Sequence, residues 1–171
     1  MPSFGVAFEV PDPFGPFLHQ RRVQLGDPAA LVMPPHVTLL PPTTVRDDRV
    51  DQVTTHLEAV AADTAPFQVT LTGTATFRPV TPTVFVPLTV GADDCRELEL
   101  RVRSGPLRRR LPFAYHPHVT VGFELSDPEL DRIAADLASF TASFWVLEFS
   151  LYEAGDDGVW HPARDYRLGG S

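Results

Sequence analysis

The sequence is poor in cysteine and contains no lysine, and each absence excludes a kind of chemistry. Cys95 is the single cysteine, so the chain can form no internal disulfide and no zinc site of clustered thiolates. All 14 basic residues are arginines, which excludes a lysine nucleophile or Schiff base. Any cationic side chain that binds phosphate must therefore be an arginine.

Positive charge and long apolar runs are also scarce. The 22 acidic residues outnumber the 14 basic ones and give a formal charge of −8. This charge argues against a long nucleic-acid track, because such a track neutralises many phosphates, but a small phosphate ligand or an RNA end remains compatible with it. No apolar run approaches the roughly 20 residues that span a bilayer, and residues 1–11 lack the basic flank of a secretory signal. We therefore expect a cytoplasmic monomer without membrane or protein partners.

Hydrophobic periodicity predicts an α+β chain whose 171 residues are the size of one domain. The expected strands cover residues 4–10, 36–40, 67–77, 83–90, 115–125, 144–152 and 159–168. The expected helices cover residues 13–25, 46–62, 92–104 and 127–138, and a capping box of Ser126 and Glu129 precedes the last one. The order strand, helix, strand with histidine, helix, strand occurs twice, which predicts that residues 1–171 form one domain with two lobes.

One short motif occurs in both halves of the chain. The sequence Pro-His-Val-Thr contributes His36 and Thr38 in its first copy, and His118 and Thr120 in its second. Successive side chains of a strand point to opposite faces, so histidine and threonine share one face and the valine between them takes the other. We expect each strand to bury its valine and to present an imidazole and a hydroxyl to a shared cleft.

Two histidines with two hydroxyls suit phosphodiester chemistry. The unperturbed pKa of histidine lies near 6.5, so one imidazole can accept a proton from water while the other donates one to a leaving oxygen. The threonine hydroxyls can donate hydrogen bonds to the non-bridging phosphate oxygens and position the phosphorus. Chemistry of this kind requires neither a metal nor another cofactor.

The two His-x-Thr-x motifs at residues 36–39 and 118–121 resemble the two-histidine (2H) phosphoesterase superfamily, which includes 2′-5′ RNA ligase-like and cyclic phosphodiesterase proteins. Residues 77–79 and 147–168 also resemble segments of this family. The resemblance implies a bilobal α+β domain, with two pseudo-twofold-related lobes whose antiparallel sheets line a central cleft and whose helices lie outside. It further implies metal-independent hydrolysis of 2′,3′-cyclic or 2′-5′ phosphodiesters of nucleotides or RNA ends. When a 2′,3′-cyclic phosphate opens, the 3′ oxygen would be the leaving group and a 2′-phosphate the product.

The resemblance also implies the roles of the motif residues. His36 and His118 would be the catalytic acid and base, without any indication of which is which, and Thr38 and Thr120 would bind phosphate. RNA ligase-like members commonly carry an arginine soon after the second motif, whereas this chain continues Val-Gly-Phe-Glu at residues 121–124. A nucleotide or another small cyclic phosphate is therefore at least as good a candidate substrate as an RNA end.

Several other residues are candidates around this site. Arg78 or one of the three arginines at residues 108–110 could replace the absent cation. His116 is a candidate for the rim of the site, and a base-stacking platform could include one or more of Phe4, Phe8, Phe77, Phe85, Tyr115 and Trp160. His116 and His118 could also form a metal pair, but a chelating site would need a third ligand, so we expect no metal. A nucleotide- or RNA-end-binding module without turnover remains the alternative to an enzyme.

Overall fold

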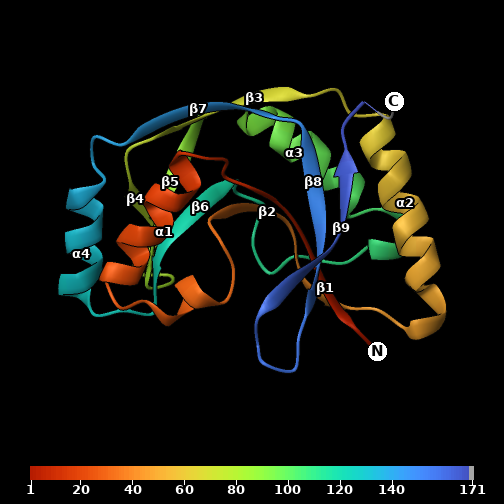
Figure 1. The fold of residues 1–171 in the computed structure, drawn as a ribbon, viewed down its shortest axis with the longest axis horizontal. Helices are drawn as coiled ribbons and strands as arrows, with labels where there is room; N and C mark the ends of the chain where they lie inside the picture. Colours follow the sequence, from red (N-terminus) through yellow and green to blue (C-terminus); the bar gives the residue numbers. More distant parts are fainter. Residues whose placement is uncertain (170–171) are drawn as a thin grey trace.

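The computed structural model describes residues 1–169, which form two antiparallel sheets and four α-helices (Figure 1). The strands are β1 (Ser3–Glu9), β2 (His36–Thr44), β3 (Phe67–Thr72), β4 (Ala75–Thr76), β5 (Thr83–Val90), β6 (His118–Phe123), β7 (Thr141–Val146), β8 (Glu148–Ala154) and β9 (Trp160–Arg167). The helices are α1 (Phe14–Gln24), α2 (Val50–Ala62), α3 (Ala92–Val102) and α4 (Asp127–Asp136). The predicted α+β class is therefore confirmed.

Each sheet contains one of the two motif strands. The first sheet has the order β2-β1-β8-β9, with β2 at its edge, and His36 lies opposite Glu9 in the pairing of β2 with β1. The second sheet has the order β4-β5-β3-β7, and β6 pairs with β5 so that His118 lies opposite Pro87. Both histidines thus begin strands that are anchored along their length by backbone hydrogen bonds.

The sheets do not coincide with the two halves of the sequence. Residues 144–152 were predicted as one strand, but the chain breaks at Leu147 into β7 and β8. The prediction was wrong because β7 pairs with β3 in the second sheet, whereas β8 pairs with β1 in the first. Periodicity along the chain contains no signal for this change of partner.

Further strand boundaries also differ from those predicted; β6, predicted over residues 115–125, covers only His118–Phe123. Pro41 and Pro42 do not end β2, which continues to Thr44. Proline is tolerated here because β2 is an edge strand, and its register with β1 shifts between the Phe4 and Val6 pairs. Residues 67–77 contain two strands rather than one, since Gly73 takes a positive φ of 65° and turns the chain between β3 and β4.

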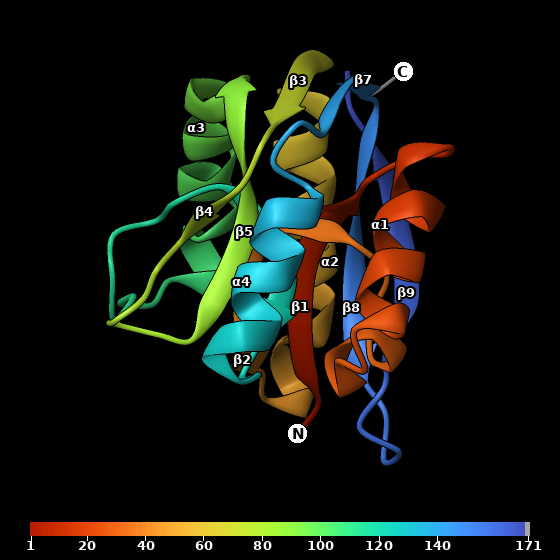
Figure 2. The ribbon, with the colours of Figure 1, turned by 90° about the vertical axis from the view of Figure 1, so that its left-hand side faces the viewer.

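Helices from one half of the chain pack on strands from the other. Helix α1 contacts β6, and α3 contacts β2. Helices α1 and α4 are neighbours in both ribbon views (Figure 2), and Phe17 stacks on Phe140 between them with ring centroids 5.7 Å apart. Among the described residues, no helix is long and apolar enough to cross a membrane.

The faces of the two motif strands are divided as their alternation predicts. Val37 and Leu39 of β2 are fully buried, and so are Val119 and Val121 of β6. Together with apolar residues of the helices they form one continuous core. The opposite faces of the two strands are therefore left for the polar residues of the motif.

Candidate active site

Both motifs contribute to one cleft with a volume of about 710 Å³. Its lining includes His36 and Thr38 from β2, and His118 and Thr120 from β6. These four side chains are partly exposed, whereas the proline and valine of each motif are buried. The structure therefore brings together the two halves of the site that the duplicated motif predicts.

Backbone carbonyls orient both imidazoles in the same way. The Nδ1 atom of His36 lies 2.8 Å from the carbonyl oxygen of Pro34, and that of His118 lies 2.6 Å from the carbonyl oxygen of His116. A carbonyl oxygen can only accept, so Nδ1 carries the hydrogen in each ring. In the neutral imidazole, Nε2 is then the nitrogen that can take up a proton.

Burial and charge lower the pKa of both histidines. The pKa of His36 falls from 6.5 to about 4, chiefly because burial disfavours the charged ring, while the hydrogen bond to Pro34 acts in the opposite direction. The positive charges of Arg22 and His118 lower it further. The pKa of His118 is also lowered, again chiefly by burial, with a contribution from His116. The charge of Arg22 contributes to the lowered pKa of His36 but not to that of His118.

Aromatic rings fix the plane of the His118 imidazole. Phe77 and Phe85 contact it edge-to-face, with ring centroids 5.1 Å and 5.2 Å away. His116 packs on the same two phenylalanines, and its centroid lies 5.9 Å from that of His118. His116 does not line the cleft, and its carbonyl oxygen is the part that contacts His118.

Tyr115 lies behind the cleft rather than in its wall. Its hydroxyl donates a 2.7 Å hydrogen bond to the carbonyl oxygen of Thr38. Burial, with smaller effects from Cys95 and Glu99, raises the pKa of Tyr115, so the hydroxyl remains a donor. The loop before the second motif therefore holds the strand of the first, an arrangement unlike the base stacking for which Tyr115 was one candidate.

The arginines proposed from the sequence lie outside the cleft. The guanidinium of Arg78 pairs with the carboxylates of Asp127 and Asp131 on α4, at 3.3 Å and 2.8 Å. Arg109 donates to the carbonyl oxygen of Pro42, 2.9 Å away, and so supports the end of β2. None of residues 108–110 lines the cleft.

Arg22 is the arginine that does line the cleft, and the sequence analysis missed it. It is 7% exposed. Its Nε donates to Asp27 at 2.6 Å, and its Nη1 donates to the carbonyl oxygen of Thr120 at 3.3 Å. No sequence signal could have found it, because Arg21 and Arg22 together resemble the solvated end of a helix, and only the packing of α1 on β6 turns one of them inward.

The rest of the cleft wall is largely apolar. Among the lining residues, only Arg22 and the two histidines have side chains that can carry a positive charge, and none is acidic. Aromatic and apolar lining residues include Met33, Phe77, Phe113, Tyr152 and Trp160. A ligand with one anionic group and a flat apolar part would suit this wall.

Metal ligands do not gather around the cleft. Within residues 1–169, no group of three or more histidine, cysteine, aspartate or glutamate side chains is positioned to hold a metal ion. His116 and His118 therefore have no third protein ligand of these kinds beside them.

Comparison with known proteins gives the family of the chain. Residues 10–158 match the model of the 2′-5′ RNA ligase superfamily, a range that includes both motifs. The chain belongs to this superfamily.

Curated relatives point to the same class of enzyme. A Bacillus licheniformis protein named "Putative phosphoesterase" is 29% identical over 145 residues, which cover 84% of this chain and 85% of the relative. A Bacillus cereus protein of the same name is 26% identical over 145 residues and 84% of each chain. The family and these relatives support a phosphoesterase.

Solved structures share the fold over nearly the whole chain. The E. coli LigT structure in complex with 3′-AMP has a TM-score of 0.68 at 17% identity and covers 98% of this chain and 99% of its own. LigT has also been solved with NADP+, phosphate and ATP. A Thermus thermophilus structure covers both chains completely, with a TM-score of 0.63 at 17% identity.

Proposed function

We propose that the protein hydrolyses 2′,3′-cyclic or 2′-5′ phosphodiesters of nucleotides or RNA ends, without a metal, through His36 and His118. The observation that carries this proposal is the matched orientation of the two imidazoles. Each donates its Nδ1 hydrogen to a backbone carbonyl and lines the same cleft. Two such rings can accept a proton from water and deliver one to the leaving oxygen at the same phosphorus.

His36 is the better candidate for the base, and His118 for the acid. Burial, with a smaller contribution from the charge of Arg22, makes protonation of His36 unfavourable, so its Nε2 is free to take a proton from the attacking water. The anionic phosphate stabilises a protonated imidazole, and His118, which lacks the influence of Arg22, gains that proton more readily. The reaction breaks the bond from phosphorus to the ribose oxygen, which receives the proton of His118.

Thr38 and Thr120 hold the phosphate between the two rings in this proposal. Both hydroxyls lie on the cleft side of their strands, two residues beyond each histidine. Their hydrogen bonds to the non-bridging oxygens would position the phosphorus and stabilise charge that develops during attack. The nucleotides and phosphate bound by LigT support a nucleotide phosphate as the ligand of this cleft.

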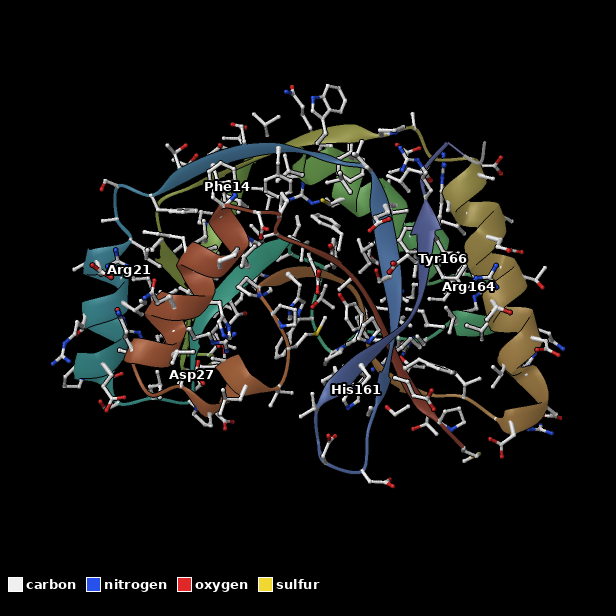
Figure 3. The ribbon with its side chains drawn as sticks, in the orientation of Figure 1. Phe14, Arg21, Asp27, His161, Arg164 and Tyr166 are labelled. Carbon is white, nitrogen blue, oxygen red and sulfur yellow. The ribbon has the colours of Figure 1, made fainter. Side chains whose placement is uncertain are left out.

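The test is hydrolysis of the four nucleoside 2′,3′-cyclic phosphates in EDTA, with the product isomer assigned. Wild-type protein is expected to produce nucleoside 2′-phosphates, and His36→Ala and His118→Ala are each expected to lose activity while keeping their melting temperatures close to wild type. His161→Ala, at an exposed histidine of β9 (Figure 3), serves as the matched control. Undiminished turnover in both active-site variants would contradict the proposal, and loss of activity in EDTA would favour a metal-dependent enzyme.

A further inference from the structure

The cleft contains a buried cation, Arg22, whose only part in the proposed reaction so far is the effect of its charge on His36. Arg22 comes from α1, far from either motif in the sequence, yet its guanidinium reaches the cleft beside the second motif. Burial of a charged side chain is costly unless it is paired. A role in ligand binding, in addition to the ion pair that Arg22 forms with Asp27, would explain why this arginine lies in the cleft wall.

Asp27 holds the guanidinium in one orientation. One carboxylate oxygen accepts from Nε of Arg22 at 2.6 Å and from the backbone nitrogen of Phe123 at 3.3 Å. The other accepts from the backbone nitrogen of Ala29 at 2.9 Å. The carboxylate thus ties α1, the turn after it and the end of β6 together, and Figure 3 shows it just beyond the C-terminal end of α1.

The remaining donors of Arg22 have no protein partner. Its Nε and Nη1 donate to Asp27 and Thr120, but Nη2 has no hydrogen-bond partner within residues 1–169. Nη2 is not fully buried, and Arg22 is one of the residues that line the cleft. An oriented guanidinium whose Nη2 carries two free N–H groups is a donor set that matches a phosphate oxygen.

We propose that Arg22 is a phosphate-binding residue, whose Nη2 donates to a non-bridging oxygen of the phosphodiester held between His36 and His118. This inference rests on the proposed function, whose substrate it makes more specific: the substrate presents its anionic phosphate to Arg22 and its nucleoside to the apolar wall. This chain has no arginine at residues 121–124, directly after the second motif, and Arg22 supplies a cation from α1 instead.

The first test is titration with inorganic phosphate, which requires no turnover. Removal of Arg22 alone would leave Asp27 buried without its partner, so the main variant is the double substitution Arg22→Met with Asp27→Asn. We expect its phosphate affinity to fall about 10- to 100-fold, the range for loss of a charge-assisted hydrogen bond. Arg21→Met is the matched control, because Arg21 is the neighbouring residue and pairs with Asp136 on α4 outside the cleft (Figure 3).

A second set of measurements separates ligand binding from a merely structural role. Arg22→Lys keeps the positive charge but loses the planar set of N–H donors of the guanidinium. It is expected to raise KM for a nucleoside 2′,3′-cyclic phosphate, with a smaller effect on kcat. The double variant should also shift the acid limb of the kcat/KM profile to higher pH, since the charge that opposes protonation of His36 is gone. Wild-type phosphate affinity and KM in a folded double variant would overturn the role of Arg22, while hydrolysis by wild type in EDTA would leave the proposed function intact.

Discussion

The hydroxyl of Tyr115 donates to the carbonyl oxygen of Thr38 at 2.7 Å, so the segment before the second motif fixes the strand of the first. Arg22 makes the reciprocal connection, because it comes from the first half of the chain and donates to the carbonyl oxygen of Thr120. The backbone of each motif threonine is therefore held by a residue from the opposite half. Both connections thus hold the strands on which the two histidines lie.

The substitution Tyr115→Phe tests the first connection. Loss of this hydrogen bond is expected to lower the free energy of unfolding by about 1 kcal/mol. We also expect kcat to fall several-fold with little change in KM, because the strand of His36 is held less firmly. Urea denaturation and steady-state kinetics measure the two effects. Unchanged kcat alongside reduced stability would show that the bond supports the fold only.

The pH dependence of kcat/KM should be bell-shaped, with its maximum on the acidic side of neutrality. kcat/KM reports the groups of the free enzyme. The acid limb should lie near the pKa of His36, about 4, because protonation removes the base. The alkaline limb should lie below 6.5, because the pKa of His118 is lowered and the acid loses its proton as pH rises. A maximum of kcat/KM above pH 7 would contradict this assignment.

Folding stability should decrease as the pH falls from 6.5 to 4, and His36 should cause part of the decrease. The unfolded chain binds a proton at His36 with a pKa of 6.5, whereas the folded chain does so only near 4. The contribution is therefore present above pH 6.5 and lost as pH falls toward 4, with an upper limit of about 3 kcal/mol at 1.36 kcal/mol per pKa unit. His36→Gln should flatten the profile of unfolding free energy against pH, and His161→Gln should not.

The two faces of β2 should respond differently to substitution. Leu39→Ala removes a side chain that is 1% exposed and should lower stability by about 2 to 5 kcal/mol through the cavity that it leaves. Thr38→Val changes the cleft face and should lower kcat/KM with a much smaller loss of stability. Thermal melting and kinetics on both variants test this division. Equal destabilisation by the two substitutions would contradict it.

Much of the fold could be predicted because its signals are local. Ser126 accepts from the backbone nitrogen of Glu129 as the capping box predicts, and α4 begins directly after it. The break at Leu147 was not predictable, because it depends on which distant strand each side of it pairs with. A run of alternating residues looks the same whether it stays in one sheet or crosses to another.

The sequence by itself determined that His36, Thr38, His118 and Thr120 would face away from the core, since the period of a strand assigns each side chain to a face. It also determined that any phosphate-binding cation would be an arginine. Only the tertiary structure decided that Arg22 and not Arg78 lines the cleft, because α1 packs on β6 while α4 supplies two carboxylates to Arg78. Side-chain alternation acts over neighbouring residues, whereas the packing of a helix on a strand about a hundred positions away depends on the whole folded core.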